Sequence, residues 1–486
     1  MTTPSAGRPS RRPVVLPVAS ELAGLRRRML PFSAALGQSL GTSMPASMAL
    51  VTPMALLPVA GKDAWLSVLL GAALMWLVRS TVVQFSQRLS APGSLFTYAA
   101  QGRHPLVALV VAVAMLVAYG MLAAWALTRS AVQLSRLTAP DRSASPTHEL
   151  VLLVVIIVVV AAGMLLGVKV SAHMTLVAEI ASITVLVGIV AFSVAQHDTA
   201  FSLDLAAVDW SRTLAGAVVF VTVLEGFEAA AALSAETSRP FRNVPRAMSA
   251  SLAAMAVLCL VAVLLGPQAV VPRGTGAGSS LAGWWFPLSS DHATADLAIE
   301  TVRLVSFVGC ALASWAVVSR LVFTLARAGA FPRAWGATSR AFRTPSTAIV
   351  LSGLAVASPG IAAFTLSDHA SGISAILDST DSGFVLMYGL VCACLPGFLR
   401  RIDEPSPWAV LAAWTGAAGM AAVLVVEVVG ELRDGEPVGL LIACACVGLG
   451  VAWWAVLRRR GDLTLAQLRI NDTATSEDVH PVSVGR

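Results

Sequence analysis

The chain alternates between long apolar runs and short polar loops from residue 31 to residue 460. The runs are mostly about 20 residues long, which is the length that an α-helix needs to cross the hydrocarbon core of a bilayer. The pattern therefore predicts an all-α integral membrane protein with about twelve transmembrane helices.

The runs also predict how the chain is divided. We expect spans over residues 31–58, 65–83, 106–134, 151–168, a fifth span ending near 195, and then 213–235, 247–271, 297–325, 346–366, 378–399, 408–429 and 438–457. These spans form two blocks of five and a final pair. The expected organisation is a disordered basic tail (1–30), a first block (31–196), a second block (210–401), spans 11 and 12 (402–460) and a polar tail (461–486).

Composition agrees with this class. Hydrophobic residues make up 57% of the chain, charged residues 12%, and the mean hydropathy is +0.78, so there is more apolar surface than one soluble core can hide. The six cysteines all lie in apolar runs, and their spacing does not match a zinc site, so we expect free thiols and neither a metal nor a cofactor. The net charge of +6 is spread over many loops, which argues against nucleic acid as a partner.

Basic residues predict the orientation in the membrane. Every second loop is rich in arginine, including the loops that hold Arg239, Arg327 and Arg400, whereas the loops between them hold few cationic residues. Because cytoplasmic loops carry an excess of Lys and Arg, this asymmetry predicts cytoplasmic termini in a multi-pass protein of the plasma membrane.

The sixth span is interrupted by the sequence Glu225-Gly226-Phe227-Glu228. A glycine between two carboxylates inside an apolar run predicts a discontinuous helix, because backbone freed at membrane depth must be buried or line a wet cavity. The alternative is a packing glycine with two glutamates at the membrane rim. In the first span, Gly37, Gly41 and Pro45 lie close together and mark a second candidate break.

The two candidate breaks begin two five-span blocks that run through the membrane in opposite directions. This arrangement is typical of inverted-repeat transporters, which bind substrate and coupling ion near such breaks. A carboxylate in the fifth span, Glu179, is a further functional candidate because intramembrane acids normally face the bundle interior or water. Its alternative is a neutral, buried carboxyl group hydrogen-bonded to a neighbouring helix.

Three motifs resemble the amino acid–polyamine–organocation (APC) family of transporters. The sixth-span signature of that family is similar to LEGFEAAAALSAETSRPFRNVPRA, its lead into span 3 to SAPGSLFTYA, and its span 8 exit to SRLVFTLARAGAFP followed by Thr344-Pro345. The motifs occur in the family's order and spacing. The resemblance covers about Leu30 to Arg401, whereas spans 11 and 12 match only in kind.

The resemblance implies a LeuT-like fold of five plus five inverted spans and transport of amino acids or related amines, by symport or antiport and often with a proton. It also implies that the substrate carboxylate meets backbone N–H groups at the break of span 1, and that its amino group meets carbonyl groups at the break of span 6. By position, the implied substrate-binding residues are Gly41, Thr42, Ser43, Met44 and Pro45 in span 1 and Leu224, Glu225, Gly226 and Phe227 in span 6.

Several positions depart from the family pattern. Ser43 replaces a glycine, Pro45 replaces an aromatic residue, and Glu225 stands where the family more often has an uncharged residue. The family's coupling lysine falls near Ser182, so coupling through a lysine is not expected. Thr237 and Ala328 replace two acidic residues of the family's inner motifs.

The expected function is therefore secondary transport of an amino acid or organic amine, with the lipid bilayer as environment and a proton among the candidate coupling ions. The coupling candidates are Glu179, Glu225 and Glu228. Glu225 is expected to pair with a cationic group of the substrate, to carry the proton, or to be a solvated vestibule residue. The alternative function is a transport-inactive sensor or scaffold with the same fold. No enzyme motif is present, and substrate identity, direction of transport and oligomeric state do not follow from the sequence.

Overall fold

The structure is a computed structural model that describes residues 25, 27–102, 104–139, 145–196, 208–269, 292–339, 342–366, 369–435, 437–461 and 468. Over these ranges the chain is helical apart from turns and isolated β-bridges, one of which joins Leu30 and Thr237. Ten stretches are long and apolar enough to cross a membrane, and the first of these, Phe32–Ser86, holds two successive crossings. The expected all-α membrane architecture is confirmed.

The first span consists of two helices, α1 (Phe32–Ser43) and α2 (Pro45–Ala60). They are separated by Met44, whose φ of 48° lies in the left-handed region and ends the regular helix. Pro45 takes the first position of α2, where its missing N–H leaves no intrahelical hydrogen bond unmade. The break is thus stabilised by the proline at the position where the family pattern has an aromatic residue.

The sixth span is also interrupted. It begins as α8 (Trp210–Val223), which is capped by the side chain of Asp209, and continues through a turn at residues 224–228 into the short 3₁₀ helix η3 (Ala229–Leu233). Gly226 has a φ of 80°, which a residue with a side chain adopts only at a cost. Both predicted interruptions are present.

The remaining elements follow the predicted order. They are η1 (Gly61–Asp63), α3 (Ala64–Ser86), α4 (Leu95–Gly102), α5 (Pro105–Thr138), α6 (Pro146–Leu165), α7 (Val168–Gln196), α9 (Pro240–Ala269), α11 (His292–Arg327), η4 (Arg333–Gly336), α12 (Ser346–Thr365), α13 (His369–Arg401), α14 (Pro407–Asp434) and α15 (Val438–Arg460). Two boundaries differ from the prediction in a way that matters. α13 begins nine residues before the expected 378, and the polar stretch before span 3 contains α4, whose residues are all buried.

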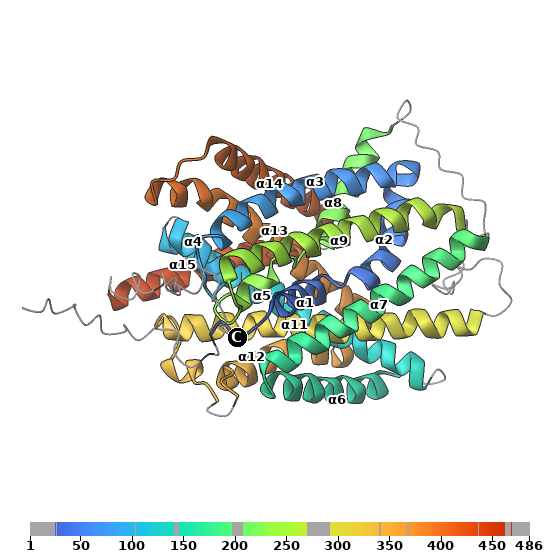
Figure 1. Cartoon of the computed structure of the whole chain (residues 1–486), viewed down its shortest axis with the longest axis horizontal. Coiled ribbons are helices and arrows are strands. Elements are labelled where there is room, and N and C mark those ends of the chain that lie inside the picture. Colours follow the sequence, from blue (N-terminus) through green and yellow to red (C-terminus); the bar gives the residue numbers. More distant parts are fainter. Residues whose placement is uncertain are drawn as a thin grey trace, which may run out of the picture.

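Burial separates a central group of helices from a lipid-facing group. In the most apolar 18-residue window of α5, α11 and α13, 61%, 78% and 72% of the residues are buried, whereas α14 and α15 have only 22% and 17%. α5 packs against α11, α13 and α15, and it runs through the middle of the bundle behind α9 and α1 in Figure 1. Exposed Val, Leu and Ile side chains cover α6, α7, α14 and α15 as expected for helices that face lipid.

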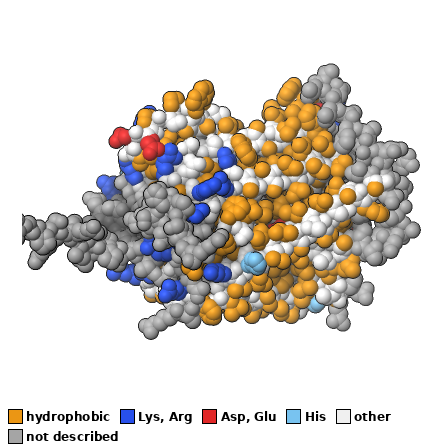
Figure 2. All heavy atoms as spheres, in the orientation of Figure 1, with side chains coloured by type: hydrophobic (Ala, Val, Ile, Leu, Met, Phe, Trp, Pro, Cys, Tyr) orange, Lys and Arg blue, Asp and Glu red, His pale blue; other side chains and the backbone are white. Residues whose placement is uncertain are grey.

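Charged side chains gather at one end of the helix bundle. In Figure 2, Lys and Arg side chains cluster at the end where α4 and the carboxyl end of α15 lie, and a belt of hydrophobic side chains covers the middle of the molecule. We call this end the basic end. It carries Arg88, Arg242, Arg327, Arg400 and Arg458 near helix termini.

Some predictions fall on parts of the chain that the structure does not describe. They concern most of the tail 1–30, nearly all of the tail 461–486, and most of the Gly/Ser-rich segment 272–296 with Trp284 and Trp285.

Candidate functional site

A cavity lies where the two interrupted spans meet α5 and α13. The cavity is small in this conformation: its volume for water-sized spheres is ≈ 50 Å³, and it is partly open to solvent. Its lining residues are Thr42, Ser43, Met44, Met48, Leu122, Trp125, Thr222, Val223, Glu225, Leu377, Thr380 and Asp381.

Four of the nine residues expected to bind substrate line this cavity. They are Thr42, Ser43 and Met44 of span 1 and Glu225 of span 6. The other five do not line it: Gly41, Pro45, Leu224, Gly226 and Phe227, which are all in the buried shell around the breaks.

Gly226 brings the two breaks into contact. A Cβ added to this residue would lie 2.5 Å from Cγ2 of Thr42, so only a glycine allows the turn of span 6 to approach span 1 this closely. The N–H of Gly226 donates to the hydroxyl of Tyr388 at 3.0 Å, so this freed backbone group is satisfied by α13. The glycine is therefore explained by both its φ and its packing.

Gly41 lies in the last turn of α1 and faces α7. An added Cβ would lie 2.0 Å from Cγ2 of Thr175 and 3.3 Å from Cβ of Ala313. The residue therefore allows α1, α7 and α11 to pack closely next to the break, which itself is at Met44.

Glu228 is held by two tyrosines from other helices. The hydroxyl of Tyr119 in α5 donates to Oε1 at 2.5 Å, and the hydroxyl of Tyr388 in α13 donates to Oε2 at 2.5 Å. All three side chains are fully buried. Because α8 ends at Val223, Glu228 and Glu225 do not share a helix face: Glu228 points to the tyrosines, and Glu225 lines the cavity.

Glu225 lies beside a second carboxylate that the sequence analysis did not single out. Asp381 of α13 lines the same cavity, is hydrogen-bonded to Thr222, and is close enough to Glu225 for the two charges to repel. Oε1 of Glu225 has no hydrogen-bond partner among the described residues. Asp381 was missed because span 10 was expected to begin at residue 378, which placed the carboxylate at the membrane edge instead of twelve residues into a helix.

Glu179 belongs to a different contact. It is fully buried in α7 and faces Ser306 and Gly309 of α11, on the side of the bundle where α1 packs between these two helices. Within the described ranges its carboxylate oxygens have no hydrogen bond of normal geometry. The structure does not bring Glu179 to the cavity that Glu225 lines.

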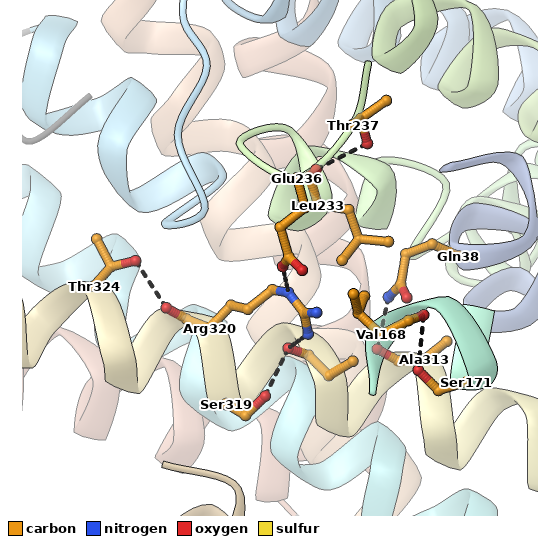
Figure 3. Close-up of polar contacts among 11 residues, drawn as sticks. Gln38, Val168, Ser171, Leu233, Glu236, Thr237, Ala313, Ser319, Arg320 and Thr324 are labelled. Carbon is orange, nitrogen blue, oxygen red and sulfur yellow. Dashed lines mark hydrogen bonds and ion pairs between the residues drawn. The ribbon is translucent and has the colours of Figure 1, made fainter. Parts of the chain in front are cut away.

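A buried ion pair lies between the cavity and the basic end. Nε of Arg320 in α11 is 2.8 Å from Oε1 of Glu236, just after η3, and the two side chains are 5% and 2% exposed. Figure 3 shows Arg320 reaching from α11 toward Glu236, with a further hydrogen bond of its guanidinium to the carbonyl of Ala316 at 3.1 Å. Nearby, the amide of Gln38 donates to the carbonyl of Ala313 at 2.8 Å and joins α1 to α11.

The segment before α1 is bound to the segment after η3 by backbone hydrogen bonds. The N–H groups of Met29 and Leu30 donate to the carbonyl of Glu236 at 2.7 and 2.9 Å, and the N–H of Ser238 donates to the carbonyl of Leu30 at 2.8 Å. The guanidinium of Arg28 adds a hydrogen bond to Ser90 at 3.1 Å. These contacts join the start of the first span to the inner part of the sixth span.

Two larger cavities lack ionisable side chains in their walls. One lies between α7 and α11 near Val185 and Val302, and the other lies between α5, α11 and α12 near Val117 and Val356. Their linings are mostly apolar and carry no ionisable side chain. Across the described ranges, no group of His, Cys, Asp and Glu is arranged to hold a metal ion.

Comparisons with known proteins agree with this architecture. A family model described as "Amino acid permease" matches residues 32–451. A manganese transporter of Eremococcus coleocola, solved with an aromatic bis-isothiourea compound, is similar in structure, with a TM-score of 0.55, 11% identity, and 93% and 99% of the two chains covered. The nucleobase-cation-symport-1 family transporter Mhp1, solved closed with bromovinylhydantoin bound, has a TM-score of 0.50, 12% identity and coverages of 94% and 99%. At these identities the two structures show the shared LeuT-like fold alone, and a comparison with curated proteins finds no match.

Proposed function

Because the chain belongs to the amino acid permease family, we propose that it is a secondary transporter that moves an amino acid or a related organic amine across the plasma membrane. The observation that carries the proposal is the cavity at the junction of the two interrupted spans, with Glu225 in its wall. Broken helices at mid-membrane supply what a small zwitterion or amine needs, which is free backbone polar groups and two oppositely oriented helix dipoles.

The two breaks have complementary roles in this proposal. The amino end of α2 follows Met44 and offers unpaired N–H groups to a carboxylate, while the carboxyl end of α8 offers carbonyl groups to an amine. Thr42 and Ser43 add hydroxyl groups to the wall of the cavity beside the α1–α2 break. Behind the cavity wall, Gly226 allows the two breaks to approach each other, and Gly41 allows α1 to pack against α7 and α11; Pro45, Leu224 and Phe227 are buried around the breaks.

The basic end is proposed to face the cytoplasm, with both termini on that side. In this conformation the ion pair of Glu236 and Arg320 and the backbone hydrogen bonds of Leu30 separate the cavity from the cytoplasm. Transport then requires that these contacts open while the opposite side closes, as in other alternating-access carriers. Opening toward the cytoplasm must therefore break the buried ion pair of Glu236 and Arg320 and the backbone hydrogen bonds of Leu30.

Coupling to a proton, or exchange of one substrate for another, completes the proposal. The candidates for carrying the proton are Glu225 in the cavity, Glu228 between its tyrosines, and Glu179 between α7 and α11. All three lie within the membrane-spanning part, where a carboxylate is retained at a cost and is usually functional.

Uptake into proteoliposomes tests the function. Purified protein should accumulate at least one labelled amino acid or amine from a panel, and either an imposed pH gradient or internal substrate should accelerate that uptake. If folded protein gives neither uptake nor exchange with any member of the panel, the chain is better described as a sensor or scaffold that has kept the permease fold.

A further inference from the structure

The cavity wall is acidic. Two of its twelve lining residues, Glu225 and Asp381, are carboxylates, and none is Lys, Arg or His. They come from different elements, since Glu225 follows α8 and Asp381 is in α13. A substrate in this cavity therefore meets a carboxylate on each of two walls.

The groups around this pair do not neutralise it. The charges that act on Glu225 are those of Asp381, Glu427 of α14 and Glu228, and the groups that act on Asp381 include Glu427 and Asp378. On α5 and α13, Tyr119 and Tyr388 face the same region as neutral hydrogen-bond donors to Glu228. Every charged group found to act on the pair is thus another acid.

The half-buried arginine of α5, Arg129, interacts with groups outside the cavity wall. Arg129 interacts with Arg303, Arg136, Glu300 and Glu149, and its guanidinium lies over the ring of Phe307. Trp125, which lines the cavity, packs edge-on against the same ring at 5.2 Å. Arg129 and Arg303 are both in contact with Phe307, and neither of them lines the cavity.

Glu225 is 7% exposed, and its Oε1 has no hydrogen-bond partner among the described residues. A buried carboxylate oxygen without a partner is costly, and the cost is removed when a cation binds to it. Both observations, an unpartnered oxygen and a second carboxylate in the same cavity, point to a ligand that brings positive charge.

On the basis of the proposed transport function, we propose that the substrate carries two cationic amino groups, one held by Glu225 and the other by Asp381. The apolar residues Met44, Leu122 and Leu377 line the same cavity and accommodate the methylene chain between these groups. A neutral amino acid carries one cationic group and so leaves one of the two carboxylates without a partner. The class comprises diamines and basic amino acids, which differ only in the additional carboxylate.

Equilibrium binding to the protein in nanodiscs, with 1,4-diaminobutane, lysine, butylamine and norleucine as probes, tests this specificity. Diaminobutane or lysine should bind at least tenfold more tightly than butylamine and norleucine, which lack the second cationic group. Lysine tighter than diaminobutane identifies basic amino acids as the class, and the reverse order identifies diamines. Proteoliposome uptake of all four probes is measured alongside.

Two variants assign the carboxylates. Asp381→Asn and Glu225→Gln should each lower the preference for the dications over the matched monocations at least tenfold, because each variant keeps only one carboxylate to hold an amino group. Asp434→Asn, at the exposed end of α14, makes the same change in charge outside the cavity and should leave all four affinities unchanged. Retained norleucine or butylamine binding also shows that a variant is folded.

The possible failures are distinguishable. If norleucine is bound and transported as well as lysine, the specificity for dications is wrong and the transporter proposal stands. If no probe of any charge is bound or transported, the transporter proposal fails together with the specificity. If the wild type prefers dications and both variants keep that preference unchanged, Glu225 and Asp381 are not the groups that recognise the second cationic group.

Discussion

The hydroxyl of Tyr388 lies 2.5 Å from Oε2 of Glu228, and the same oxygen of Tyr388 accepts the N–H of Gly226 at 3.0 Å. One side chain of α13 thus satisfies a backbone group and a carboxylate of the span 6 turn. Since Tyr119 of α5 donates to the other oxygen of Glu228, the turn is joined to two of the three most buried long helices. These three hydrogen bonds hold the turn from which Glu225 lines the cavity.

Replacement of Tyr388 by Phe should impair transport at least tenfold. The change leaves the N–H of Gly226 and one carboxylate oxygen of Glu228 without their partner, which costs about 1–3 kcal/mol for each buried group. Uptake rate and thermal unfolding of the purified variant are the measurements. Tyr98→Phe is the matched control, because Tyr98 is equally buried and its hydroxyl has no hydrogen-bond partner in the described ranges; equal losses in both variants would contradict the role of Tyr388.

Glu225→Gln should separate substrate recognition from proton coupling. We expect the variant to transport neutral amino acids, to lose uptake of substrates with a second cationic group, and to keep its response to a pH gradient. Loss of pH-driven uptake for every substrate, with exchange preserved, would make Glu225 the proton carrier instead. Wild-type kinetics and pH dependence would remove both roles and leave only the backbone near Gly226 as the substrate contact.

Gly41 should tolerate no side chain unless Thr175 is made smaller. Gly41→Val should abolish transport, and even Gly41→Ala should reduce it severalfold, because the new Cβ overlaps Cγ2 of Thr175. Thr175→Ser removes that methyl group and should restore part of the activity in the double variant. Gly120→Ala, where no atom lies within 4 Å of the added Cβ, should be silent. Failure of Thr175→Ser to rescue would return Gly41 to the role of a backbone donor to the substrate.

Removal of the buried ion pair should favour the inward-facing state. Glu236→Gln leaves the guanidinium of Arg320 buried without a counter-charge, at a cost of about 3–5 kcal/mol to the closed conformation. A cysteine placed at Ser43 should then react faster with a thiol reagent applied from the basic end. The control is Glu404→Gln, which disrupts the exposed pair with Arg88 and should change stability by about 1 kcal/mol or less. An unchanged labelling rate in Glu236→Gln would show that this pair does not lock the inner side.

Orientation is tested by labelling intact cells. A cysteine at Lys62 in η1 should react with an impermeant thiol reagent from outside, whereas a cysteine at Arg333 in η4 should react only in inverted vesicles. Both positions are exposed and lie at opposite ends of the bundle. Labelling of the Arg333 position from outside would reverse the orientation and exchange the proposed inner and outer sides.

The sequence predicted the fold because each of its signals is local. A break in span 6 follows from Gly226 between two carboxylates, and a break in span 1 follows from Pro45 after a Gly/Ser-rich run. Each signal is a property of a few consecutive residues, and the membrane allows freed backbone only where protein or water satisfies it. The exact residue at which the first span breaks does not follow from the sequence. The break lies at Met44, which adopts a left-handed φ, and methionine does so far less readily than the nearby glycines.

The sequence could not predict which charged side chains lie next to each other or line the cavity. Glu236 and Arg320 are 84 residues apart and form an ion pair only because η3 packs against α11. Asp381 becomes a cavity residue only because α13 extends beyond its apolar run and packs against α5. Such pairings depend on helix packing, for which a single sequence has no local signal, although an acid near the start of an apolar run is a position worth testing.

The first span and the inner half of the sixth are attached to each other at two levels. The hydroxyl of Ser39 accepts the N–H of Ala230 at 3.1 Å within the bundle, and Leu30 pairs with the backbone at Thr237 near the basic end. Because α1 and the η3 segment are joined at these two levels, they cannot slide along each other without breaking hydrogen bonds, and we expect them to tilt together as one unit. A movement of α1 during transport should therefore carry the η3 segment with it, and Met44 and Gly226, where the backbone leaves helical geometry, are the positions at which we expect the chain to bend.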